Sequence, residues 1–129
     1  MTDTTAIFNL KALYENNLVF LVENKDDALA VMKAGEQAVG LGTGNTDIFL
    51  QYIAENKPRA HIVISASNRD TWQYTMANIH NQLEMLNTPH TTISLTTKYK
   101  TFSEFYLADP EEFFHEVHTS RLCGEIDME

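Results

Sequence analysis

Residues 18–35 read LVFLVENKDDALAVMKAG and contain a strand, a helix and a helix stop in succession. The run at 18–22 is continuously apolar, which is typical of a strand buried on both faces of a parallel sheet. Apolar residues then recur at helical spacing up to position 34, and Gly35 follows as a C-cap signal. This stretch predicts one strand-helix unit of an α/β protein.

The same pattern recurs along the rest of the chain. Further strands are expected at 38–41, 61–66 and 91–95, and further helices at 6–14, at 47–56 and from the polar residues 67–70 to about 86. Aromatic residues from Phe102 onward predict one or two closing helices, with a helix start at Asp109 and Pro110. The alternation predicts an α/β fold, a parallel sheet of about four strands with helices on both faces.

Length and charge limit the possible functions. The chain has 129 residues, the size of a single domain that is expected to span 1–129. Its net charge is -9, and residues 103–129 hold eight acids and one base, so an acidic C-terminal segment begins at about 103. Non-specific affinity for nucleic acid comes mainly from Lys and Arg, so this charge predicts no non-specific coating of DNA.

Cysteine content and hydropathy predict the location. Cys123 is the only cysteine, which excludes an internal disulfide and a cysteine-based zinc cage. The first residues lack the basic and apolar regions of a signal peptide, and no apolar run approaches the length of a membrane span. We therefore expect a cytoplasmic protein with no membrane partner.

Ligands of parallel α/β sheets bind beyond the carboxyl ends of the strands. Here those ends are 23–24, 42–45, 67–70 and 96–100. Glu23 directly follows the first strand, where its carboxylate can act on a ligand, although it can also cap the next helix. The turn at 42–45 can cradle a phosphate with its backbone amides, or can be only a tight turn. The candidate anion-binding residues are Gly42, Gly44, Asn45, Arg69, Lys98 and Lys100, of which the three cations can also be ordinary solvated surface charges.

Two further groups have simpler structural interpretations. His115 and His118 are three positions apart and can share a metal ion with Glu111 or Glu112, but we favour the simpler interpretation of two surface histidines on an acidic helix. A second set of aromatic residues can stack on bases, yet their helical spacing favours a place in the core: Trp72, Tyr74, Phe102, Phe105 and Tyr106.

The order and spacing of several motifs resemble the TOPRIM domain of phage and plasmid primases and primase-helicases. The matching segments are FNLKALYE at 8–15, VFLVE at 19–23, DAL at 27–29, AVGLG at 38–42, IVIS at 62–65, KTFSE at 100–104 and LADP at 107–110. The resemblance covers roughly residues 8 to 114. It implies a Rossmann-like sheet and a strand-end glutamate, matched here by Glu23, that acts as general acid or base in nucleotidyl or phosphodiester transfer.

The resemblance also implies a magnesium site, which this chain matches poorly. Ser67 and Arg69 stand where the family has an Asp-x-Asp pair, although a register shifted by one places Asn68 and Asp70 there. A hydroxyl and a guanidinium in place of two carboxylates remove the attraction for Mg²⁺ and add repulsion. We expect this site to be lost. If Mg²⁺ binds, the expected ligands are Glu23, Asn68, Asp70 and Glu104.

These observations lead to three hypotheses about function. The first is a stand-alone, degenerate TOPRIM-like domain of phage or mobile-element type that has no catalytic activity. It has a binding or accessory role in DNA replication or repair, and its partner is a replication-related protein, a nucleotide or a nucleic-acid end. The second is a magnesium-dependent, primase- or nuclease-like phosphotransferase that uses Glu23. The third is a protein-interaction module whose acidic C-terminal segment recruits a basic partner or imitates DNA.

Overall fold

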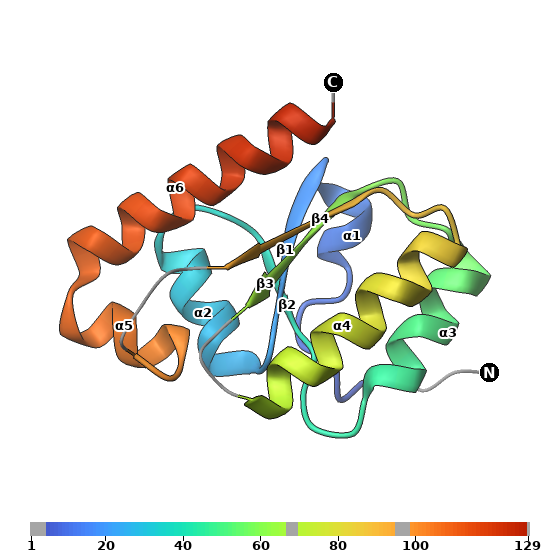
Figure 1. Cartoon of the computed structure of the whole chain (residues 1–129), viewed down its shortest axis with the longest axis horizontal. Helices are drawn as coiled ribbons and strands as arrows, with labels where there is room; N and C mark the ends of the chain where they lie inside the picture. The colour runs from blue at the N-terminus through green and yellow to red at the C-terminus, as the bar shows by residue number, and fades with distance from the viewer. Residues whose placement is uncertain (1–4, 67–69, 95–98, 129) are drawn as a thin grey trace.

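A four-stranded parallel sheet lies at the centre of the structure, a computed structural model that describes residues 5–66, 70–94 and 99–128 (Figure 1). The strands are β1 (Leu18–Val22), β2 (Ala38–Gly40), β3 (His61–Ala66) and β4 (His90–Ser94), in the spatial order β2-β1-β3-β4. All three pairs of neighbouring strands are parallel. The prediction of a four-stranded parallel sheet is confirmed, and every residue of the central strand β1 is buried.

Helices cover both faces of the sheet (Figure 1). One face packs against α1 (Ala12–Glu15), α3 (Thr46–Asn56) and α4 (Asp70–Met85), and the other against α2 (Lys25–Lys33), α5 (Phe102–Ala108) and α6 (Pro110–Asp127). Alternate residues of β1 enter the two cores, with Val19 and Leu21 on the first face and Phe20 and Val22 on the second. No helix within the described residues is both long enough and apolar enough to span a bilayer.

The N-terminal segment differs from the expected helix at 6–14. Phe8 forms an antiparallel bridge with Gly40, and the backbone amide of each residue donates to the carbonyl oxygen of the other at 2.9 and 3.1 Å. Asn9 follows with a φ of 62°, which is incompatible with a continuing helix. The prediction was therefore wrong before position 12, because pairing with β2 overrides the local helical spacing.

The acidic segment from about 103 is one of the layers of the fold. Phe102, Phe105, Phe113 and Val117 are buried against the sheet and α2. The helix start expected at Asp109 and Pro110 is confirmed, since the Asp109 side chain accepts a hydrogen bond from an amide in the first turn of α6. Most of the carboxylates of this segment lie on its exposed side.

Candidate functional site

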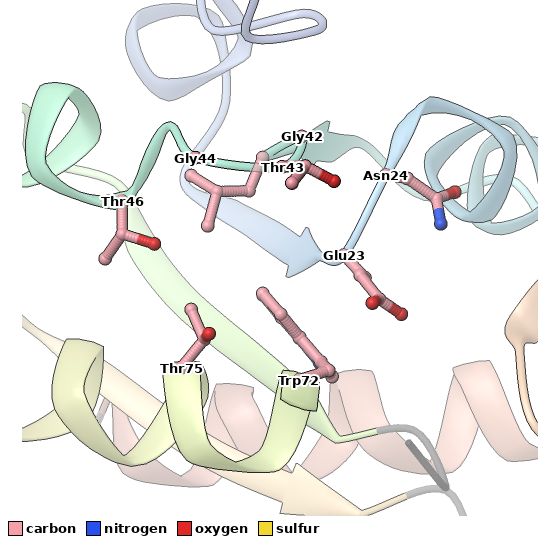
Figure 2. A pocket seen from close by; sticks show the side chains of 9 residues that line it. Glu23, Asn24, Gly42, Thr43, Gly44, Thr46, Trp72 and Thr75 are labelled. Atoms are coloured by element: carbon pink, nitrogen blue, oxygen red, sulfur yellow. The ribbon is translucent and has the colours of Figure 1, made fainter. Parts of the chain in front are cut away.

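A cavity of about 350 Å³ opens at the carboxyl ends of β1 and β2 (Figure 2). The chain passes from β1 to β2 in one direction and then crosses back to β3 on the other side of β1, so the strand order reverses beside this cavity. Open parallel sheets bind ligands at such a reversal. We call it the switch-point cavity, and its lining residues are Glu23, Asn24, Leu41, Gly42, Thr43, Gly44, Thr46, Trp72 and Thr75.

Glu23 is positioned by the sheet itself. It is the first residue after β1, and its carbonyl oxygen accepts a hydrogen bond of 2.9 Å from the Gly42 amide, which extends the pairing of β1 and β2. Its side chain is half-buried and lines the cavity. The N-cap of α2 is Asn24, whose Oδ1 accepts from the Asp27 amide at 2.9 Å. The capping alternative for Glu23 is therefore wrong.

The turn before α3 forms the second side of the cavity. Gly42 and Gly44 have φ angles of 82° and 78°, a region that glycine adopts without strain. Asn45 donates its Nδ2 to the Leu41 carbonyl oxygen at 3.0 Å and makes no side-chain cap for α3. The amides in the first turn of a helix have no carbonyl partners within it, and the helix dipole adds positive potential there. This side of the cavity therefore suits an anion.

The third side belongs to α4. Trp72 is 3% exposed and donates its Nε1 to the Ser65 carbonyl oxygen at 2.7 Å, so its expected place in the core is confirmed. It nevertheless contributes to the wall of the cavity, one helical turn before Thr75. Tyr74 is 82% exposed, so its expected place in the core is wrong, because it points away from the stripe that contains Trp72. The sequence did not predict that Thr46 and Thr75 line the cavity. For Thr46, the one available signal was a hydroxyl side chain at the start of the helix that follows the glycine turn.

The structure separates some of the predicted site residues. Lys100 and Glu104 do not line the switch-point cavity. Glu104 belongs to the start of α5, where its Oε2 accepts from the Lys100 amide at 3.2 Å and its amide donates to Thr101 Oγ1 at 3.1 Å. Asn68, Arg69 and Lys98 lie outside the described residues, as does Ser67, and Asp70 is the first residue of α4.

The predicted metal ligands can be compared with the positions of side chains in the described part of the chain. Within it, Glu23 and Glu104 belong to no group of three His, Cys, Asp or Glu side chains close enough to share an ion. His115 and His118 are likewise outside any such group within these ranges, and both are exposed on α6. A magnesium site at Glu23 that includes Asn68 therefore stays a prediction.

Asp27 follows the candidate site in sequence but has a different environment. It is 1% exposed, and its Oδ1 accepts a hydrogen bond of 3.0 Å from the Ser103 amide at the start of α5. Its Oδ2 is buried and has no hydrogen-bond partner among the described residues. Burial raises the pKa of the Asp27 carboxyl above 3.8, against the opposing effect of the bonds to Ser103. Asp27 thus joins α2 to α5 and does not line the cavity.

The switch-point cavity brings together Glu23, Gly42 and Gly44 from the sequence prediction, while Asn45 holds the turn in place. Three comparisons, with models of protein families, with curated proteins and with solved structures, found no match.

Proposed function

We propose that the chain binds a nucleotide, either free or at the end of a nucleic acid, in the switch-point cavity. In this proposal it is a TOPRIM-like domain of phage or mobile-element type without catalytic activity, with an accessory role in DNA replication or repair. One observation carries the proposal: a glycine turn at a helix start and the Glu23 carboxylate line the same cavity of about 350 Å³.

The two sides of the cavity complement the two ends of a nucleotide. A phosphate fits beside Gly44, where a Cβ atom would meet no other atom within 4 Å, and beside the first turn of α3. The Thr46 hydroxyl adds a donor on this side. Glu23 can accept hydrogen bonds from a sugar hydroxyl or a base amino group. The volume lies at the lower end of the usual range for small-ligand cavities, about 300–1,000 Å³, which suits one nucleotide.

The sequence supports binding without phosphoryl transfer. The TOPRIM resemblance assigns magnesium to two aspartate positions, which Ser67 and Arg69 occupy here. A guanidinium at a metal position repels Mg²⁺, whereas it attracts phosphate. The nucleotide is therefore proposed as a ligand and not as a substrate.

Thr46→Glu tests the proposal. A carboxylate at the first position of α3 is favourable for the helix, so the fold is retained, but it repels a phosphate in the cavity. We expect calorimetric titration with dTMP, and with a 5′-phosphorylated oligonucleotide, to show affinity at least about tenfold weaker than for the unchanged chain.

Asn78→Glu is the matched control, since it adds the same charge at an exposed position of α4 that does not line the cavity. The proposal is wrong if the unchanged chain shows no saturable binding at millimolar ligand, or if both variants weaken binding equally. Primer synthesis or DNA nicking in Mg²⁺ or Mn²⁺ that disappears in Glu23→Gln would instead favour the phosphotransferase alternative.

A further inference from the structure

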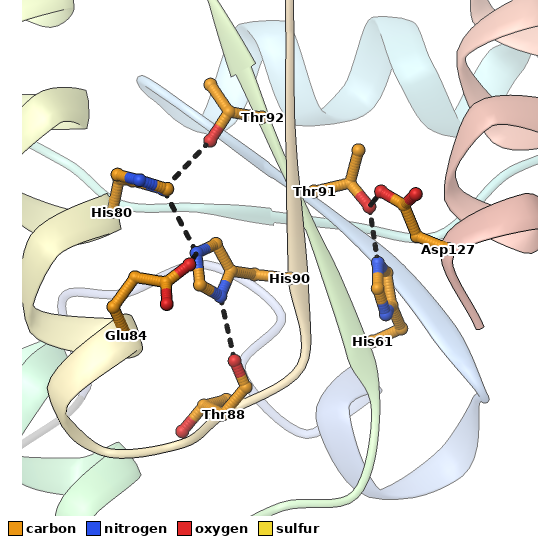
Figure 3. A network of polar contacts seen from close by, with 8 residues as sticks. All are labelled: His61, His80, Glu84, Thr88, His90, Thr91, Thr92 and Asp127. Atoms are coloured by element: carbon orange, nitrogen blue, oxygen red, sulfur yellow. Dashed lines mark hydrogen bonds and ion pairs between the residues drawn. The ribbon is translucent and has the colours of Figure 1, made fainter.

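Three side chains that commonly bind metals meet at the opposite end of the sheet from the switch-point cavity (Figure 3). His80 and Glu84 lie one turn apart on α4, and His90 is the first residue of β4. One ligand atom of each side chain lies within 4.8 Å of the other two. His90 Nε2 is 3.0 Å from His80 Nδ1 and 3.3 Å from Glu84 Oε1.

The turn between α4 and β4 holds this arrangement in place. Asn87 adopts a φ of 56°, its amide donates to the Glu84 carbonyl oxygen, and the Thr88 amide donates to the Leu83 carbonyl oxygen at 3.0 Å. This pair of bonds is a Schellman motif, which ends the helix in a fixed geometry. The turn therefore sets the position of His90 relative to Glu84.

The same turn orients the His90 ring. His90 Nδ1 lies 2.8 Å from the Thr88 carbonyl oxygen, which can only accept a hydrogen bond, so the proton is on Nδ1. In the neutral ring, Nε2 then directs a lone pair toward the Glu84 carboxylate at 3.3 Å. The same lone pair also faces His80 Nδ1 at 3.0 Å, so the space between the three side chains is filled either by a proton that His80 Nδ1 donates to His90 Nε2 or by a metal ion that all three side chains bind. A carbonyl acceptor on the far nitrogen is also the usual support of a metal-binding histidine.

We propose that His80, Glu84 and His90 bind a divalent transition-metal ion, with Zn²⁺ as the expected ion. Ligand atoms around tetrahedral Zn²⁺, at bond lengths of about 2.0–2.1 Å, are about 3.3 Å apart. The two short distances within the cluster, 3.0 and 3.3 Å, are close to this separation. Two imidazoles and one carboxylate favour Zn²⁺ over Mg²⁺, which takes oxygen ligands.

The surroundings leave room for a fourth ligand. The His90 side chain is 6% exposed, whereas that of Glu84 is 64% exposed. A cavity of about 280 Å³ adjoins Glu84 and His90 and is open to solvent. The fourth position then belongs to water or to an external group. The bound ion connects the end of α4 to the start of β4, a strand at the edge of the sheet.

The test is a titration of the full chain with Zn²⁺ after treatment with a chelator. We expect saturable binding of one ion, and intense visible absorption typical of tetrahedral geometry when Co²⁺ replaces Zn²⁺. Glu84→Gln is the first variant, because Glu84 is mostly exposed and its substitution leaves the fold intact. It should weaken Zn²⁺ binding at least about tenfold, and His90→Gln should weaken it further.

The double variant His115→Gln, His118→Gln is the matched control, because it removes two exposed histidines of α6 and should bind Zn²⁺ as the unchanged chain does. Absence of saturable binding by the unchanged chain would overturn the proposal and leave the cluster held by the hydrogen bond between His80 and His90. The proposal would also be overturned if Glu84→Gln bound Zn²⁺ as tightly as the unchanged chain, or if the control variant weakened Zn²⁺ binding as much as Glu84→Gln does.

Discussion

Asp27 shows how a single residue can make stability depend on pH. Its carboxyl group is buried at the junction of α2 and α5, where it accepts one backbone hydrogen bond from Ser103. Burial raises the pKa of Asp27, because the charged form loses more hydration than the hydrogen bonds from Ser103 and Phe102 replace. The folded chain therefore keeps a proton on Asp27 at pH values where the unfolded chain has released it.

Asp27→Asn should remove this pH dependence. Between the unfolded pKa of 3.8 and the raised folded pKa, the folded state binds more protons, so the free energy of unfolding falls as the pH rises. We expect the stability of the unchanged chain, minus that of Asp27→Asn, to decline as the pH rises from about 4 and then to level off. Urea denaturation of both chains at a series of pH values measures this difference. A difference that stays constant or increases with pH contradicts the assignment.

Contacts between elements depend on a few polar residues as well as on the core. Arg121 of α6 donates from Nη1 to the buried Glu36, in the connection between α2 and β2, and from Nε to Glu125 at 2.6 Å. The Glu36 side chain is 8% exposed, so its carboxylate depends on this partner far more than the exposed Glu125 does. Arg121 thereby connects α6 to the edge of the sheet near β2.

Arg121→Met should therefore destabilise the fold by roughly 1–2 kcal/mol, because it keeps the apolar stem but leaves the Glu36 carboxylate buried without a cation. The same substitution in a Glu36→Gln background should cost less, since the buried charge is then absent. Urea denaturation of the four chains gives both values. Equal costs in the two backgrounds would show that packing of the arginine stem, and not the ion pair, is responsible.

At the scale of the whole molecule, the uneven charge of the chain corresponds to one layer of the fold. The net charge of -9 is concentrated after residue 102, and that segment forms the α5 and α6 layer of the fold. Phe113 lies at the centre of this layer, 0% exposed and in ring contact with Phe102 and Phe105. The acidic segment therefore contributes apolar core on its inner side and carboxylates on its outer side.

Phe113→Ala should destabilise the entire fold by about 3–5 kcal/mol, the usual cost of removing a buried phenylalanine. Leu122→Ala on the same helix is the control, because Leu122 is 58% exposed and its loss should change stability by less than about 0.5 kcal/mol. Urea denaturation followed by far-ultraviolet circular dichroism measures both. If Phe113→Ala left the midpoint unchanged, the acidic segment would not be a layer of the folding unit.

Much of the architecture could be predicted from local patterns. The bounds of β1 and β3 agree with the apolar runs, and Gly35 follows α2 with a φ of 94°. These features depend on neighbours in the sequence, which is why periodicity and capping signals find them. The segment around Phe8 was misjudged because its backbone pairs with Gly40, more than thirty positions away.

In the candidate sites, too, some residues could be predicted from the sequence, whereas others depend on the tertiary structure. Glu23 and the 42–45 turn could be anticipated because parallel strands end at one edge of the sheet, so two strand ends are close whenever the strands are neighbours. The place of Thr75 in the cavity and the meeting of His80 with His90 depend on how α4 crosses the sheet and how its last turn closes. Local periodicity sets which face of a helix is buried, but only the packing of that helix against distant strands decides which of its polar side chains meet others.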